Sequence, residues 1–185
     1  MNIIFLDMDG VLNCNKVQED WIKQYGHTKE AIDAFKKKYC LNQKPPYYFI
    51  VPELLERFNT LYSKIPNCKI VWSSSWRNTV MKKSKLFIEG LYYQCGLPKD
   101  SFIGYTPYIP YLLRYNEIEE WIKDHIDKFE IEKCAIIDDM YEASISGNKF
   151  LNIPIKFFQT SEKYGLTEEI SKNILTFFME KNNND

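Results

Sequence analysis

The chain has 185 residues, with 24 lysines and arginines against 25 aspartates and glutamates, and its formal net charge is −1. This length is enough for one well-buried core and does not require a second domain. The near-neutral charge argues against a strongly basic surface for tight, sequence-independent binding of nucleic acid. We find no apolar segment long enough to span a membrane, and acidic residues follow the N-terminus too early for a signal peptide.

Cysteine and histidine usage points to a reducing compartment. The cysteines are odd in number, scattered and without a CxxC pair, which argues against a disulfide framework and against a structural zinc site. We therefore expect an intracellular, cytoplasmic protein. The two histidines, His27 and His125, offer no ligand cluster. The five cysteines are Cys14, Cys40, Cys68, Cys95 and Cys134.

Short apolar runs rich in Ile and Val alternate with helical patterns, which predicts an α/β fold with a doubly wound parallel sheet. The predicted strands are residues 2–6, 69–72, 134–137 and 153–158. In chain order, the predicted helical segments are an uneven pattern over 17–39 with Thr28 as an N-cap, a helix from Pro52, a helix over 84–96, a helix from Asn116 with Glu119 as a capping-box partner, and a last helix after Thr167. Residues 104–110 are predicted to be loop.

The stretch from about residue 14 to 50 lies between the first two polar motifs. Its helical pattern ends in two prolines and an aromatic run. We interpret it as a small helical cap inserted over the crevice of a single domain that spans residues 1–185.

The first polar motif, Asp7-Met8-Asp9-Gly10, directly follows the first predicted strand. Two carboxylates this close raise each other's pKa or require a cation. A calcium loop would need a further oxygen ligand where Val11 stands. In an open parallel sheet, the carboxyl ends of the strands form the ligand crevice. The motif therefore suggests metal-assisted chemistry on an anionic substrate.

Polar residues also follow two later strands: Ser73-Ser74-Ser75-Trp76-Arg77 comes after residues 69–72, and Asp138-Asp139 comes after 134–137. Taken alone, the Asp138-Asp139 pair could equally be a helix N-cap. Trp76 is interpreted as a packing residue. Because all three motifs follow strands, we expect them to meet at one edge of the sheet.

The order of these motifs, together with Arg114 before a helix, resembles the haloacid dehalogenase (HAD) superfamily of phosphatases and phosphotransferases. More narrowly, it resembles small-capped HAD domains, one subgroup of which is fused in RNA-repair proteins. A receiver domain has its acidic pair first and its phosphorylated aspartate later, so the motif order rejects it. Neither a phosphate-binding P-loop nor a dinucleotide fingerprint occurs.

The resemblance implies a set of roles. Asp7 would be the nucleophile that forms an aspartyl-phosphate, and Asp9 would protonate the leaving oxygen and then activate water. Mg²⁺ would be bound by Asp7, the backbone carbonyl of Asp9 and Asp138, with Asp139 ligating directly or through water.

Four residues are expected to contact the phosphoryl group or the rest of the substrate. Ser74 is preferred over Ser73 because of strand alternation and its spacing to Trp76. Arg114 occupies the position where the family usually has lysine, so charge is preserved and geometry is changed. Arg77 is a second cationic contact, with a surface ion pair as the alternative. Lys123 or Lys133 would be substitutes for the usual lysine.

We therefore expect a Mg²⁺-dependent phosphomonoester hydrolase. Its phosphorylated substrate is left open between a small molecule such as a nucleotide, a phosphoprotein side chain and a nucleic-acid end, and the oligomeric state is also left open. The alternative is a non-catalytic phosphate-binding or interaction module on the same fold. Possession of both Asp7 and Asp9 argues against that alternative, because a binding module needs no acid beside a nucleophile.

Overall fold

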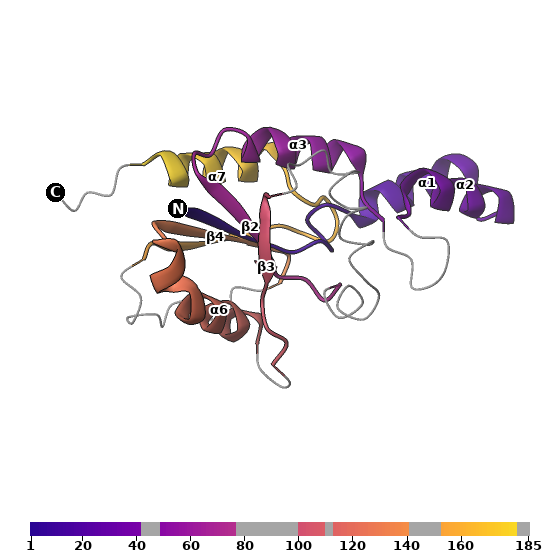
Figure 1. Ribbon diagram of the computed structural model, residues 1–185. Coiled ribbons are helices and arrows are strands. Elements are labelled where there is room, and N and C mark those ends of the chain that lie inside the picture. The colour runs from indigo at the N-terminus through magenta and orange to yellow at the C-terminus, as the bar shows by residue number, and fades with distance from the viewer. Residues whose placement is uncertain (42–48, 77–99, 110–112, 141–152, 181–185) are drawn as a thin grey trace.

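A computed structural model describes residues 1–41, 49–76, 100–109, 113–140 and 153–180. Within these ranges, parallel strands form one sheet in the order β3-β2-β1-β4-β5 (Figure 1). The predicted doubly wound parallel sheet is therefore confirmed. The strands are β1 (Asn2–Leu6), β2 (Cys68–Trp72), β3 (Phe102–Tyr105), β4 (Lys133–Asp138) and β5 (Ile155–Gln159).

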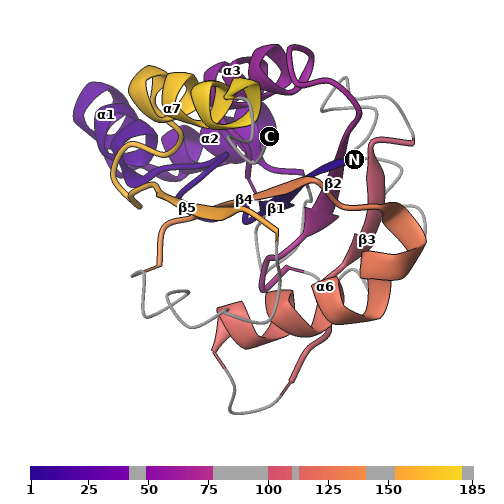
Figure 2. The same ribbon diagram turned by 90° about the vertical axis from the view of Figure 1, so that its left-hand side faces the viewer.

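Helices cover both faces of the sheet. Helices α3 (Pro52–Tyr62) and α7 (Glu168–Met179) lie on one face, and α6 (Arg114–Phe129) lies on the other (Figure 2). Every residue of β1 and β4 is buried, as expected for central strands that are covered on both sides. These apolar runs therefore have no solvent-facing positions, which explains their lack of polar alternation.

The core consists of two clusters that the sheet separates. Successive residues of a strand point to opposite faces, so Ile4 and Leu6 pack toward α3 and α7, whereas Ile3 and Phe5 pack toward α6. On the α6 side, the Phe5 and Trp121 rings meet edge to face with 5.5 Å between their centroids. Packing of the two clusters on opposite faces fixes the position of the strands. It thereby fixes the positions of the residues that directly follow the strands.

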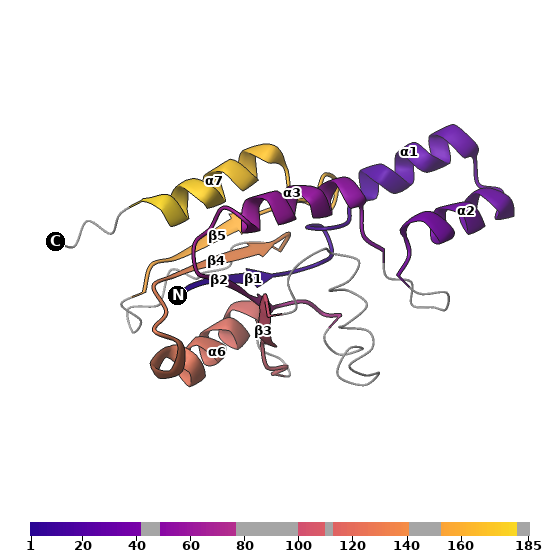
Figure 3. The same ribbon diagram turned by 45° about the horizontal axis from the view of Figure 1, so that its top comes forward.

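Helices α1 (Asn15–Tyr25) and α2 (Lys29–Tyr39) form a helical hairpin that projects from the core near the start of α3 (Figure 3). The uneven pattern predicted over 17–39 thus breaks at Gly26, which has a φ of 76°. The predicted N-cap is confirmed, because the Thr28 hydroxyl accepts a hydrogen bond of 3.1 Å from Ala31 N. No residue of α1 is buried, and Ala31 is the buried residue of α2.

Strands β2 and β4 differ from their predicted bounds by a single residue at one or both ends, and three other predictions about elements differ more. Residues 102–105 form edge strand β3, although residues 104–110 were predicted to be loop; its half-buried residues carry no strong apolar run. Helix α6 begins at Arg114 with Leu113 as its N-cap, and Glu119 pairs with Lys123 in place of capping the helix. Strand β5 begins two residues later than predicted. The helix predicted over 84–96 lies outside the described residues.

The strand register brings three strand ends to one place. Strand β1 lies between β2 and β4, and Leu6 is in register with both Trp72 and Ile137. The residues that follow these three positions therefore meet at the carboxyl edge of the sheet, next to the point where the strand order reverses, which is the usual ligand site of such sheets.

As to membranes, no helix in the described ranges has both the length and the apolar character needed to cross one.

Candidate functional site

Three carboxylates converge at the carboxyl edge of the sheet. Asp7 follows β1, Asp138 ends β4, and Asp139 comes next; one oxygen from each lies within 4.8 Å of the others. The backbone continues the sheet here, since Asp7 N donates to Ile137 O at 3.0 Å. Asp7 and Asp138 are buried, whereas Asp139 is half-buried. The sequence expectation that the first and last motifs meet is therefore confirmed in position.

Burial and mutual repulsion disfavour the ionised forms of this cluster. Burial raises the pKa of Asp7, against the opposing effects of Arg114 and a hydrogen bond from Ser74. Burial, followed by the charge of Asp7, raises the pKa of Asp138 to about 7. The same two causes raise the pKa of Asp139 to about 6. Among the described residues, the site thus gathers more carboxylates than it has cations to neutralise them.

Arg114, the first residue of α6, is the cation of this site. Its Nη1 lies 3.7 Å from Asp7 Oδ1 and 3.5 Å from Asp138 Oδ2. Its Nε lies 3.8 Å from Glu117 Oε2. The Glu117 carboxylate is buried and also accepts a hydrogen bond of 3.1 Å from Ile109 N, which fixes its place beside the guanidinium. Nη1 is buried with no hydrogen-bond partner among the described residues, so it retains donor capacity for an anion.

The two lysines considered as substitutes for Arg114 lie elsewhere. Lys123 is exposed on α6 and pairs with Glu119 at 3.1 Å. Lys133 begins β4, at the amino end of the strand, and its Nζ donates to Phe177 O at 2.9 Å. Lys133 is buried. Neither lysine is therefore placed to stand in for the family's usual lysine beside Asp7.

Asp9 is held by two neighbours. Its Oδ1 accepts a hydrogen bond from Asn13 Nδ2 and its Oδ2 accepts one from Trp76 Nε1, both at 2.8 Å. Asp9 itself is exposed, whereas both donors are buried. Sequence reasoning assigned Trp76 to packing and missed Asn13. A local signal existed only for Asn13, an amide four positions from Asp9, because Trp76 lies 67 positions from Asp9 in the sequence.

Gly10 is needed where the backbone passes Asp139. Its φ is 61°, a conformation that favours glycine, and a Cβ at this position would lie 2.2 Å from Asp139 Oδ2 and 2.6 Å from Asp139 Cβ. The loop that carries Asp7 and Asp9 therefore lies so close to Asp139 that a residue with a Cβ would not fit at position 10.

The serines that follow β2 differ in their partners. The Ser74 hydroxyl hydrogen-bonds Asp7, and its Oγ accepts a hydrogen bond of 3.3 Å from Trp76 N. Ser73 Oγ is buried with no hydrogen-bond partner among the described residues. Ser74, the preferred phosphate contact, is thus the serine that contacts Asp7, and Ser73 is the serine with spare hydrogen-bonding capacity. Arg77 lies outside the described residues.

The loop that follows β5, at Gly165 and Leu166, packs against the chain segment that follows Asp7-Met8-Asp9-Gly10. Leu166 N donates to Val11 O at 2.9 Å, and Arg57 Nη1 donates to Leu166 O at 2.7 Å. Gly165 has a φ of 67°, and a Cβ there would lie 2.5 Å from Leu54 Cδ1 and 2.9 Å from Val11 O. These contacts pin the Asp7–Gly10 loop between the sheet and α3.

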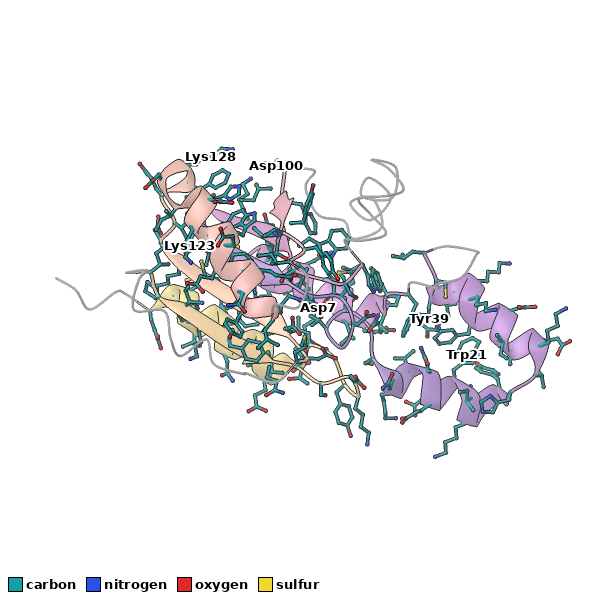
Figure 4. The ribbon with its side chains drawn as sticks, turned by 90° about the horizontal axis from the view of Figure 1, so that it is seen from below. Asp7, Trp21, Tyr39, Asp100, Lys123 and Lys128 are labelled. Carbon is teal, nitrogen blue, oxygen red and sulfur yellow. The ribbon has the colours of Figure 1, made fainter. Side chains whose placement is uncertain are left out.

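The donor set fits a hard divalent cation. The three carboxylates outnumber the one guanidinium that pairs with Asp7 and Asp138 among the described residues, and oxygen-only ligands suit Mg²⁺ better than a thiophilic metal. Seen from below, Asp7 lies on the side of the core that faces the helical hairpin, with Trp21 and Tyr39 between the two hairpin helices (Figure 4). Chemically, the arrangement provides a buried carboxylate, an exposed second carboxylate, a guanidinium and a group of three carboxylates able to hold a metal ion.

Comparison with known proteins agrees with this geometry. The fold is similar to the structure of the HAD domain of effector protein Lem4 from Legionella pneumophila, with a TM-score of 0.50, 18% sequence identity and 97% of each chain covered. A search of curated proteins gave no match. Residues 3–170 match the family model described as the HAD domain in Swiss Army Knife RNA repair proteins. The chain therefore belongs to this family of HAD domains.

Proposed function

We propose that the chain is a phosphomonoester hydrolase that works through an aspartyl-phosphate on Asp7 and requires Mg²⁺. Membership of the HAD family supports a phosphatase-type activity. The observation that carries the proposal is the buried Asp7 carboxylate, which faces both the Asp138–Asp139 pair and a guanidinium nitrogen with spare donor capacity. Nucleophile, acidic pair and cation are the parts needed to bring a carboxylate and a dianionic phosphate together.

The charge balance explains the metal requirement. A phosphomonoester carries about two negative charges near neutral pH, and it would enter a site that already has excess negative charge. Bound Mg²⁺ would neutralise this charge and polarise the phosphoryl oxygens. We assign its ligands to Asp7, the backbone carbonyl of Asp9, Asp138 and Asp139, the last directly or through water.

The reaction then follows from the residues. An Asp7 oxygen attacks phosphorus, the bond from phosphorus to the leaving oxygen breaks, and Asp9 gives its proton to that oxygen. Water next attacks the aspartyl-phosphate and loses a proton to Asp9, which frees Asp7 and inorganic phosphate. The exposed position of Asp9 suits this role, because a leaving group can reach it from solvent.

Phosphate contacts are assigned to donors around Asp7. Arg114 would bind a phosphoryl oxygen through Nη1, whose ion-pair partners Asp7 and Asp138 lie 3.7 and 3.5 Å away. Ser74 and Ser73 would supply hydroxyl donors, the first from its contact with Asp7 and the second from its spare capacity. Arg77 is retained as a substrate contact on sequence grounds alone.

The helical hairpin is proposed to be the cap within a single domain of residues 1–185, with the insertion spanning about 14–50. It joins the site directly, since α1 begins only two residues after Asn13. A hairpin of this size leaves room for a large phosphorylated substrate. A nucleotide, a phosphoprotein side chain and a nucleic-acid end remain the substrate classes to compare.

The test is hydrolysis of p-nitrophenyl phosphate with and without Mg²⁺. We expect metal-dependent turnover that Asp7→Asn abolishes, with a loss of at least about 10³-fold because no nucleophile remains. Asp124→Asn is the matched control, since it removes the same charge from an exposed position on α6 and is expected to keep wild-type activity. Folded wild-type protein that binds a phosphate mimic in Mg²⁺ yet never turns over would instead indicate a binding module.

A further inference from the structure

Both oxygens of the Asp9 carboxylate are occupied by donors that cannot reverse their roles. The Trp76 indole N–H is donor-only. The Asn13 amide is oriented by its other end, because Asn13 Oδ1 accepts a hydrogen bond of 2.9 Å from Gly10 N and so leaves Nδ2 to face Asp9. With one donor at 2.8 Å on each oxygen, the carboxylate has a single orientation although it is exposed to solvent.

The two donors come from different parts of the chain. Asn13 closes the loop after β1 and also contacts Phe49 O at 3.3 Å. Trp76 lies beyond β2, and its backbone N donates to the Ser74 hydroxyl that contacts Asp7. Trp76 is 4% exposed and Asn13 is 5% exposed, so both are fixed by packing. Such supported donors are suited to orient a group that must meet a reacting atom within a few tenths of an ångström.

We propose that Trp76 and Asn13 are positioning residues that hold Asp9 in line with the leaving oxygen. This inference rests on the proposed function, because it concerns the proton that Asp9 transfers. In the first step, the Asp9 O–H bond breaks as the leaving oxygen gains the proton and separates from phosphorus. Loss of one donor lets the carboxylate rotate, and a misplacement of about 1 Å is enough to slow such a step about 10²-fold.

The predicted signature is a dependence on the leaving group. Phenol is a poor leaving group with a pKa of about 10, like the tyrosine side chain, and needs the proton from Asp9. Nitrophenol leaves readily as its anion and needs that proton far less. A positioning defect should therefore slow the first turnover of phenyl phosphate much more than that of p-nitrophenyl phosphate, with KM unchanged for both.

The experiment measures single-turnover release of the two phenols, in excess Mg²⁺, by wild type and Trp76→Phe. This substitution keeps an aromatic ring and removes the N–H. We expect the rate ratio of p-nitrophenyl to phenyl phosphate to rise about tenfold or more. Trp72→Phe is the matched control: Trp72 Nε1 is buried with no hydrogen-bond partner among the described residues, so the ratio should stay at the wild-type value.

A second variant guards against misfolding of the first. Asn13→Ala removes the donor to the other Asp9 oxygen and should raise the same ratio, whereas Asn15→Ala, two residues further on at the start of α1, should not. An equal slowing of both substrates, or the same change in Trp72→Phe, would overturn the positioning role alone. A wild-type protein without Mg²⁺-dependent turnover would overturn the proposed function, and this inference with it.

Discussion

The carboxyl edge of the sheet and the helical hairpin are constructed in opposite ways. At the edge, Asp7 and Asp138 are buried and fixed by strands that pack on both faces. In the hairpin, α1 has no buried residue and α2 has only Ala31. The hairpin depends instead on aromatic contacts, with the Trp21 ring 5.7 Å from Phe35 and 5.9 Å from Tyr39.

This difference in packing suggests different roles for the two regions: the edge would carry out the reaction, and the hairpin would adapt to the substrate. The edge must keep charged groups together against their own repulsion, which requires a rigid and well-packed frame. The hairpin has few buried contacts, and such elements open locally at a lower free-energy cost than the core. We therefore expect substitutions at the edge to change the reaction, and substitutions in the hairpin to change local order and the choice of substrate.

The sharpest comparison uses one substitution in each region. Gly10→Ala places a methyl group against Asp139 and should lower activity about 10²-fold or more while raising the Mg²⁺ concentration needed for half-maximal rate. Gly26→Ala also introduces strain, about 1–3 kcal/mol for a backbone with φ 76° and ψ −173°, but nothing lies within 4 Å of the new Cβ. Its activity should stay within about twofold of wild type. Steady-state kinetics over a Mg²⁺ titration measure both, and equal losses would contradict the comparison.

A second prediction concerns pH, metal and stability. The native pKa values of Asp138, about 7, and Asp139, about 6, lie above the ordinary unfolded value of about 3.9. Between these values the native state binds more protons than the unfolded state, so the metal-free protein loses stability as pH rises from about 4 to 7. Mg²⁺ at a hundredfold excess over Kd should raise Tm by roughly 5–10 °C at pH 8.

The same Mg²⁺ addition at pH 5 should raise Tm little, because Asp138 and Asp139 are then largely protonated. Thermal melts in EDTA and in Mg²⁺ across this range make the measurement. Asp138→Asn is the control: it should raise Tm of the metal-free protein at pH 8 and remove most of the metal response. An equal Mg²⁺ effect at pH 5 and pH 8 would show that the carboxylates are not the metal site.

The smallest effect on the reaction is expected from the hairpin. Trp21→Ala removes the ring shared by both helices and the hydrogen bond of 2.9 Å from Trp21 Nε1 to Ala31 O. Amide hydrogen exchange should accelerate across residues 15–39 and stay unchanged in β1 and β4. Turnover of p-nitrophenyl phosphate should remain within about threefold, since Asp7 and its neighbours keep their frame. Lost protection in β4 would mean that the hairpin is part of the core.

Local signals in the sequence predicted most of the elements correctly. The apolar run of β1 was identified with its bounds, and Thr28 was identified as an N-cap from its own position in the chain. A strand bound or an N-cap of this kind depends on residues only a few positions away, so a short stretch of sequence is enough to predict it. Strand β3 was missed because its only strong determinant is pairing with β2, which no local pattern records.

The site was predictable where it depends on local motifs, and not where it depends on contacts between distant parts of the chain. Motifs at strand ends placed Asp7, Asp138 and Asp139 at one edge, because the carboxyl ends of parallel strands must meet there. Of the two partners of Asp9, Trp76 was not predictable, since it lies 67 positions away in the chain, whereas Asn13 is only four positions away. The sequence placed Arg114 where the family usually has lysine and kept Lys123 and Lys133 as substitutes. The structure places Arg114 beside Asp7 at the carboxyl edge, whereas Lys133 begins β4 at the opposite end of the sheet.

By itself, then, the sequence determined the sheet, the order of its motifs and the kind of chemistry they support, because hydrophobic periodicity and strand-end chemistry are local properties. Only the tertiary structure decided which groups touch. It placed Arg114 Nη1 between Asp7 and Asp138, forced glycine at position 10 against Asp139, and aimed two buried donors at Asp9. Those contacts join residues that are far apart in the chain, and their geometry is set by packing that no local pattern encodes.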